Sequence, residues 1–266
     1  MSFSIEGKTA IVTGAANGVG LAIARHFAQK GANVMFADLD EGRLAKEVGD
    51  TRDDDTMRYF AGDLRERLTL ANLLSATLDA FDRVDILVNG SRQMMPTDPL
   101  DPEDDSIEAL LDQNLITAFR LSQMVAKRMI KQAEGQDEGQ AGAIINLSSI
   151  AARRTHPSLL GYSVSCAALD QMTRSLAVAL AAQRIRVNAL AFGSVMSASL
   201  KDTLKTHREY RGDIEEHTPL GRIAAPDELA EAVQFLASDS ARFLTGQIMT
   251  IDGGRTLLDP VAAPAH

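Results

Sequence analysis

Short apolar runs alternate with longer amphipathic segments over almost the whole chain. The short runs predict buried strands, and the longer segments, with apolar residues at helical spacing, predict helices between them. We expect strands at 9–12, 33–37, 57–61, 86–88, 143–147, 186–191 and 248–251. We expect helices at 19–29, 41–48, 68–81, 107–131, 162–182 and 226–237. This order predicts a doubly wound α/β fold, with a seven-stranded, mostly parallel sheet and helices on both faces.

The pattern of apolar and polar residues does not divide the chain into separate domains. No repeat or linker stands out, so residues 1–266 are expected to form a single domain. The polar, glycine-rich stretch 132–142 predicts an exposed loop. Segment 194–219 carries mixed charge after the sixth strand and is the best candidate for a lid over a ligand. The alternative is a plain helical insertion at the surface.

A glycine-rich turn joins the first strand to the first helix. Gly14 would allow the tight turn, while Gly18 and Gly20 would let backbone approach a pyrophosphate attracted by the helix N-terminus. Asp38 ends the second strand, where a carboxylate can bind adenosine ribose hydroxyls and would repel a 2′-phosphate. The turn and Asp38 together predict a Rossmann domain that binds NAD, with NADP the less favoured cofactor.

Composition excludes several classes of protein. Apolar residues make up 45% of the chain, and the longest apolar run, 176–182, is too short to cross a membrane. The net charge of −9 argues against nucleic acid as a partner. A single cysteine permits no internal disulfide, and the N-terminus lacks the layout of a signal peptide, so we expect a cytoplasmic protein. No cluster of His, Cys and carboxylates predicts a metal site.

From Gly7 to about Gly254 the motifs resemble those of the short-chain dehydrogenase/reductase superfamily. Segment 13–20 looks like the family's TGxxxGxG, and Asn114 is similar to its catalytic asparagine. Ser149 lies thirteen residues before Tyr162, as the family's serine and tyrosine do. Further similar segments lie at 62–64, 87–89, 188–193, 219–222, 235–239, 245–247 and 252–254.

This resemblance implies an oxidoreductase that interconverts a secondary alcohol and a carbonyl of a small-molecule substrate. Tyr162 would exchange a proton with the substrate oxygen, Ser149 would hydrogen-bond that oxygen, and Asn114 would anchor a water. It also implies a homo-oligomer, a dimer or tetramer built on the helices at 107–131 and 162–182. The residues expected to hold the cofactor are Gly14, Asn17, Gly18, Val19, Gly20, Asp38, Asp63, Leu64, Asn89, Gly90, Tyr162, Gly193, Val195 and Ser197.

The chain departs from the family at position 166, where Cys166 stands in place of a lysine. The resemblance implies that this lysine would lower the pKa of Tyr162 and hold the nicotinamide ribose. Without a cation, roughly one tyrosine in a thousand is ionised at pH 7. We therefore expect weak alcohol oxidation that strengthens toward alkaline pH, and a smaller loss in carbonyl reduction.

Several interpretations of this departure stay open. Arg92, Arg153, Arg154 or His156 could supply a replacement cation, although solvated loop charges are the simpler interpretation. Cys166 could be a redox switch or a nucleophile, although an apolar filler is simpler. The chain could be a catalytically degraded paralogue that acts as a partner or regulatory subunit, or a divergent enzyme with another reaction. The cysteine could also be an engineered or erroneous substitution.

Three smaller departures lie near or after the ends of predicted strands. The family's Asn-Asn-Ala-Gly reads Asn89-Gly90-Ser91-Arg92 here, and its usual proline after the sixth strand is Phe192. The usual threonine further on is Ser197, which keeps a hydroxyl.

Overall fold

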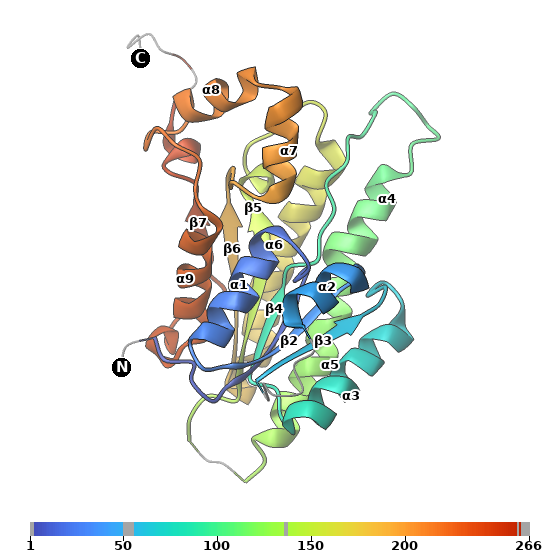
Figure 1. The fold of residues 1–266 in the computed structure, drawn as a ribbon, viewed down its shortest axis with the longest axis vertical. Coiled ribbons are helices and arrows are strands. Elements are labelled where there is room, and N and C mark those ends of the chain that lie inside the picture. Colours follow the sequence, from blue (N-terminus) through green and yellow to red (C-terminus); the bar gives the residue numbers. More distant parts are fainter. Residues whose placement is uncertain (1–2, 50–55, 136–137, 260, 262–266) are drawn as a thin grey trace.

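The computed structural model describes residues 3–49, 56–135, 138–259 and 261. Within these residues one seven-stranded sheet has the order β3-β2-β1-β4-β5-β6-β7, and all six neighbouring pairs are parallel (Figure 1). The doubly wound α/β prediction is confirmed. The strands are β1 (Thr9–Thr13), β2 (Asn33–Asp38), β3 (Met57–Ala61), β4 (Ile86–Asn89), β5 (Gly142–Ser149), β6 (Ile185–Phe192) and β7 (Ile248–Ile251).

Helices cover both faces of the sheet because successive strand residues point to opposite sides. Ala10 and Val12 pack into the apolar cluster on one face, and Ile11 between them packs into the cluster on the other. The helices of the first face are α1 (Gly18–Gln29), α2 (Glu41–Val48) and α9 (Pro226–Ala237). Those of the second are α3 (Arg67–Phe81), α5 (Thr117–Gln132) and α6 (Leu160–Leu180).

The helix expected over 107–131 is not continuous. It consists of α4 (Ser106–Leu111), a π-helical turn at Asp112–Ile116, and α5. The Thr117 hydroxyl donates to the Asp112 carbonyl oxygen at 2.9 Å, which helps to satisfy the widened turn. A π turn adds one residue, which hydrophobic periodicity does not reveal. The turn contains Asn114, one of the expected site residues.

Segment 194–219 forms two helices, α7 (Ala198–Thr206) and α8 (Glu209–Glu216), at the end of the molecule where β6 terminates (Figure 1). Ser197 caps α7, because its hydroxyl accepts a hydrogen bond from the Leu200 amide at 3.2 Å. α7 buries only Leu204, and α8 buries no residue. The helical surface insertion is therefore present, and its action as a lid stays a prediction. Loop 132–142 lies partly outside the described residues.

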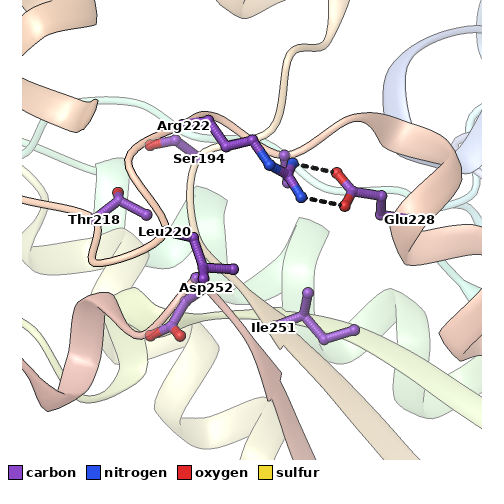
Figure 2. A pocket seen from close by; sticks show the side chains of 9 residues that line it. Ser194, Thr218, Leu220, Arg222, Glu228, Ile251 and Asp252 are labelled. Carbon is purple, nitrogen blue, oxygen red and sulfur yellow. Dashed lines mark hydrogen bonds and ion pairs between the residues drawn. The ribbon is translucent and has the colours of Figure 1, made fainter.

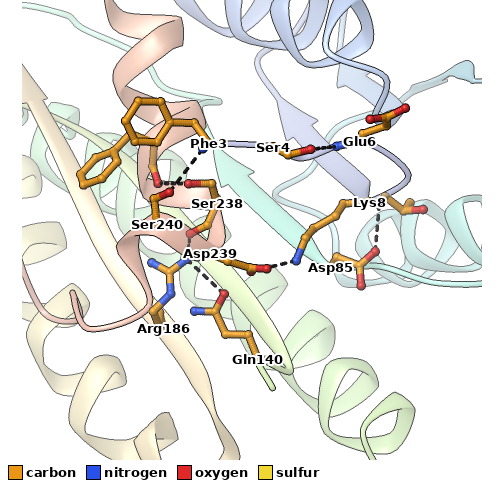
Figure 3. Close-up of polar contacts among 12 residues, drawn as sticks. Phe3, Ser4, Glu6, Lys8, Asp85, Gln140, Arg186, Ser238, Asp239 and Ser240 are labelled. Carbon is orange, nitrogen blue, oxygen red and sulfur yellow. Dashed lines mark hydrogen bonds and ion pairs between the residues drawn. The ribbon is translucent and has the colours of Figure 1, made fainter. Parts of the chain in front are cut away.

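Polar contacts at the opposite end of the sheet join distant parts of the chain (Figure 3). Lys8 Nζ lies 3.2 Å from Asp239, and the Phe3 amide donates to the Ser240 hydroxyl at 3.3 Å. The buried Arg186 of β6 donates to the Ser238 carbonyl at 3.1 Å, and burial lowers the pKa of its guanidinium to about 10. These contacts secure the amino-terminal edge of the sheet and leave the carboxyl edge for ligands. Among the described residues no helix has the length and apolar character needed to cross a membrane.

Candidate active site at the carboxyl edge of the sheet

The strand order reverses between β1 and β4, so the chain departs in opposite directions from these two neighbours. At such a switch point the loops after adjacent strands separate and leave a crevice at the carboxyl edge, the usual ligand position in open α/β sheets. Most of the expected site residues lie at or just after the carboxyl ends of β1 to β6, at the start of α1 or at the start of α6, and Asn114 lies in the π-helical turn.

The glycine loop touches the loop after β4 backbone to backbone. Gly14 has φ +71°, and a Cβ placed on it would lie 2.5 Å from the Gly90 carbonyl oxygen. A Cβ on Gly20 would lie 2.1 Å from the Gly14 carbonyl oxygen. Asn17 precedes α1 with its side chain exposed and without a capping hydrogen bond. The loop therefore presents bare backbone and a free amide at the positive end of α1.

Thr13 connects these two loops, a role that the sequence did not suggest. Its hydroxyl oxygen accepts hydrogen bonds from the amides of Gly90 at 3.0 Å and Ser91 at 3.1 Å. It lies 3.4 Å from the Val88 carbonyl, to which it donates. A hydroxyl at the last residue of β1, directly before the turn glycine, was the available signal.

Asp38 lies at the end of β2 beside the glycine loop. Its carboxylate accepts hydrogen bonds from the amides of Ala16 at 3.0 Å, Leu39 at 2.7 Å and Asp40 at 3.2 Å. A carboxylate has about four acceptor positions, so about one remains for a ribose hydroxyl. On the other side of the loop, a Cβ on Gly18 would lie 3.7 Å from the Ser197 side chain. The glycine loop thus lies between Asp38 and the start of α7.

Other expected cofactor residues present different groups to the edge. Asp63 is paired with Arg65 at 2.5 Å, and this hydrogen bond holds the pKa of the carboxyl below its usual value. The side chains of Leu64 and Asn89 are buried in the interior, so only their backbone can face a ligand. Val19 and Val195 are also buried. Gly90 and Gly193 follow the ends of β4 and β6.

The side chains expected to move a proton lie together at the ends of β5 and α6. Tyr162 is 4% exposed and packs in a small apolar cluster with Leu110 and Cys166. Burial raises the pKa of Tyr162, opposed first by the positive charge of Arg92 and more weakly by a hydrogen bond with Ser149. The phenol is therefore neutral at physiological pH and exists in the form that donates a proton.

Arg92 contacts this phenol directly. Its Nη1 donates to Tyr162 Oη at 3.0 Å, and the guanidinium carbon lies 4.3 Å from the centre of the Phe192 ring. Arg92 is an exposed loop residue, as the simpler interpretation held, but its guanidinium also contacts the phenol. The sequence carried a signal in two linked departures, an arginine after β4 and an aromatic ring at the end of β6.

The other three candidate cations make contacts elsewhere. Arg153 donates to the Thr250 hydroxyl at 3.2 Å, and Arg154 donates to the Thr256 carbonyl. The His156 ring accepts a hydrogen bond from the Ser158 amide at 3.2 Å.

Asn114 makes protein contacts with both ends of its amide. Its Oδ1 accepts from the Gln93 amide at 2.8 Å, and its Nδ2 donates to the Gln93 carbonyl at 2.9 Å and to Ser165 Oγ at 3.1 Å. The side chain thus joins the segment after β4 to α6. Its expected part as a water anchor stays a prediction.

Cys166 is buried beside Tyr162. Burial raises the pKa of the thiol above its ordinary value, so it is neutral at physiological pH. A neutral, buried thiol fits the apolar-filler interpretation and not a thiolate nucleophile.

A small surface pocket lies beyond β7, separate from the Tyr162 cluster (Figure 2). Arg222 and Glu228 pair across its rim at 2.7 Å, and this pair lowers the pKa of Glu228 to about 2. Ser194 lines the pocket and accepts a hydrogen bond from Arg255 at 3.1 Å. Over the described ranges, no three or more His, Cys, Asp or Glu side chains gather as metal ligands.

Comparisons with known proteins agree with this architecture. A family model described as Enoyl-(Acyl carrier protein) reductase matches residues 14–256. D-threitol dehydrogenase of Mycolicibacterium smegmatis is 36% identical over 96% of this chain and 95% of its own. The 3-oxoacyl-[acyl-carrier-protein] reductase FabG of Thermotoga maritima is 32% identical over 94% of this chain and 98% of its own.

Solved structures extend the comparison to three dimensions. A short-chain dehydrogenase/reductase of unknown function from Caenorhabditis elegans, solved with cofactor, superposes with a TM-score of 0.86 at 27% identity. The match covers 97% of this chain and 98% of the other. The fold, the glycine loop and these relatives lead to one conclusion: the chain belongs to the short-chain dehydrogenase/reductase superfamily of nicotinamide-dependent oxidoreductases.

Proposed function

We propose that this protein is an NAD(H)-dependent oxidoreductase that interconverts a secondary alcohol and a carbonyl. The observation that carries the proposal is the neutral Tyr162 hydroxyl, which lies with Ser149 at the sheet edge that also holds the glycine loop. Two relatives are named for reactions of this kind, a dehydrogenase of D-threitol and a reductase of 3-oxoacyl groups.

The residues present fit a dinucleotide. Bare backbone at Gly14 and Gly20, the amino end of α1 and the free amide of Asn17 suit a pyrophosphate, and Asp38 suits a ribose hydroxyl. The remaining residues of the proposed site are Gly18, Val19, Asp63, Leu64, Asn89, Gly90, Tyr162, Gly193, Val195 and Ser197. A bound nicotinamide would supply or accept the hydride at the substrate carbon.

The protein's own part in the reaction is proton transfer and orientation. In carbonyl reduction Tyr162 Oη donates its proton to the substrate oxygen, and the Ser149 hydroxyl hydrogen-bonds the same oxygen. In alcohol oxidation the proton returns to Tyr162 Oη, which must first be ionised. Because burial favours the neutral phenol, reduction starts from the prevalent form of the tyrosine.

The two directions should differ in their pH dependence. With the pKa of Tyr162 above its ordinary value, the phenol stays protonated from about pH 6 to 9, so the rate of reduction should be flat. The tyrosinate fraction grows about tenfold per pH unit, so the rate of oxidation should rise at that slope. Rates of NADH consumption and NAD reduction measured across this range check both. Oxidation that is already fast and flat at neutral pH would contradict the assignment.

Replacing Asp38 with asparagine should relax cofactor selectivity. The amide oxygen can still accept from the Ala16 amide, but the charge that repels a 2′-phosphate is gone. The ratio of kcat/KM for NADPH over NADH should rise by about 10- to 100-fold. Asp40→Asn is the matched control, since Asp40 is a neighbouring carboxylate that caps α2 through the Arg43 amide. An equal change in both variants would show that Asp38 does not select the cofactor.

The activity itself is tested with NADH and a panel of small ketones, which are the carbonyls that yield secondary alcohols. Turnover of at least one carbonyl supports the proposal. NADH binding without turnover of any compound would instead favour a dinucleotide-binding partner or regulatory subunit. Failure to bind NADH would refute both.

We also propose a single domain that forms a homo-oligomer, with 194–219 as its substrate lid. Val164 and Val178 on α6 are exposed apolar side chains, as expected for a helix that packs on a second copy. Sedimentation velocity would show a monomer if this proposal is wrong.

A further inference from the structure

A guanidinium lies over the end of β6 and contacts the tyrosine that carries the proposed chemistry. Arg92 starts from the loop after β4, donates to Tyr162 Oη at 3.0 Å, and approaches the Ser148 carbonyl at 3.5 Å. Its plane covers the buried Phe192 ring, with 4.3 Å between the guanidinium carbon and the ring centre. Cation–π contact and hydrogen bonding together hold a flexible side chain in one place.

The loop that carries Arg92 is itself held from three sides. Thr13 binds the amides of Gly90 and Ser91, and the Gln113 side chain donates to Ser91 Oγ at 2.9 Å. Asn114 binds both backbone groups of Gln93, the next residue. Both neighbours of Arg92 are therefore anchored, which directs its side chain toward Tyr162.

Arg92 is the positive charge that acts on Tyr162 among the described residues. On α6, the neighbouring Cys166 is a neutral thiol, and Asp170 lies near that thiol. At the end of β5, Ser149 carries an uncharged hydroxyl. The basic side chains that follow it, Arg153, Arg154 and His156, bind other partners. From α4 the phenol meets the apolar Leu110. A buried phenol that must ionise needs an opposite charge close by, and Arg92 meets that need.

We propose that Arg92 is a catalytic residue of this site, whose guanidinium stabilises the tyrosinate that forms when Tyr162 gives up its proton. The inference rests on the proposed oxidoreduction. In reduction the proton passes from Tyr162 Oη to the substrate oxygen, and a bound nicotinamide would supply the hydride to the carbon. Because Nη1 donates to the phenol oxygen, Arg92 does not compete with the substrate for the phenol hydrogen. In oxidation the same contact holds the tyrosinate ready as the base.

A direct test needs no substrate. Tyr162 is replaced in the full chain by a fluorinated tyrosine, whose phenol ionises at lower pH, and its ionisation is followed by fluorine NMR. Arg92→Gln should raise the pKa of this phenol by about 1–2 units. Arg153→Gln, which removes a positive charge from the segment after β5, should leave it within about 0.3 units. Equal shifts in the two variants would overturn the proposal, and circular dichroism confirms that each variant is folded.

Kinetics provide a second test. Arg92→Gln should slow alcohol oxidation by about 10- to 100-fold wherever the phenol is mostly protonated, because the tyrosinate fraction falls by that factor, and the pH at which the oxidation rate levels off should rise by about 1–2 units. Arg92→Lys should keep part of the rate, since it retains the charge without the planar contact with Phe192. A loss of rate with no upward shift of the pH at which the oxidation rate levels off would indicate a merely structural role and contradict the proposal.

A lysine introduced beside the tyrosine distinguishes a site whose positive charge comes from Arg92 from a site that has no positive charge. Cys166→Lys should restore at least about tenfold of the oxidation rate in the Arg92→Gln variant. In the native background it should change the rate by less than about threefold, because one cation is already present. A gain of orders of magnitude in the native background would show that Arg92 does not supply the charge. If no carbonyl is turned over, the proposed function fails, while the NMR titration still decides whether Arg92 acts on Tyr162.

Discussion

Replacing Tyr162 with phenylalanine should lower the rate of carbonyl reduction by about 10²–10⁴-fold, the range for a positioned acid–base group. The substitution removes the only atom, Oη, that can pass a proton between this side chain and the substrate, and it leaves the ring packed against Leu110 and Cys166. The fall should appear mainly in kcat, with a much smaller change in the Kd for NADH, because Tyr162 is one of many expected cofactor contacts and the glycine loop and Asp38 are untouched. Steady-state kinetics and NADH fluorescence titration measure the two quantities.

Tyr59→Phe is the matched control. Tyr59 lies on β3 and is 37% exposed, so loss of its hydroxyl should leave kcat within about twofold. A Tyr162→Phe enzyme that retains most of its rate would show that another group moves the proton. The Ser149 hydroxyl and the bound cofactor would then account for the activity that remains.

Replacing Gly14 with alanine should destabilise the protein and weaken dinucleotide binding together. The left-handed backbone, φ +71°, costs a side-chain residue about 1–2 kcal/mol. The added Cβ would also meet the Gly90 carbonyl carbon at 2.7 Å and the Ser91 nitrogen at 2.9 Å, and this overpacking costs about 1–3 kcal/mol more. Because these atoms are backbone, they can yield only if the loop after β4 moves. We expect NADH affinity to fall at least about tenfold.

Gly7→Ala separates the two contributions. Gly7 has φ +72°, and a Cβ there meets no atom within 4 Å, so this variant adds the backbone strain without the overlap. Thermal or urea unfolding should show a smaller loss of stability for Gly7→Ala, and its NADH affinity should be unchanged. Equal losses in the two variants would mean that the contact between the two loops contributes nothing.

The sequence predicts the ends of helices and strands correctly where local residue types define them. The helix expected at 226–237 coincides with α9, because Pro226 suits a first helical turn and Ala237 closes the amphipathic pattern. The strands at 57–61 and 248–251 also match. Elsewhere the strands run one to three residues further than their apolar cores, since polar residues such as Thr13 and Ser149 extend the ladder at the carboxyl edge.

The sequence does not predict in the same way which side chains turn into the interior. Leu64 and Asn89 belong to motifs expected at the cofactor, yet their side chains turn into the interior. The π turn that carries Asn114 interrupts a pattern that reads as one long helix. These features depend on contacts with other parts of the molecule, which the spacing of apolar residues within one segment does not predict.

The doubly wound α/β fold, the phosphate-binding turn and the family can all be predicted from the sequence, because each depends on residue types at short, regular spacing. The sequence also showed that position 166 holds no cation. The position of the nearest cation becomes clear only from the tertiary structure. Arg92 lies 70 residues before Tyr162 along the chain, and its side chain reaches the Tyr162 hydroxyl across the end of β5. Parallel strands bring their carboxyl ends to one edge, so a charge absent from position 166 of α6 can be supplied from the loop after β4.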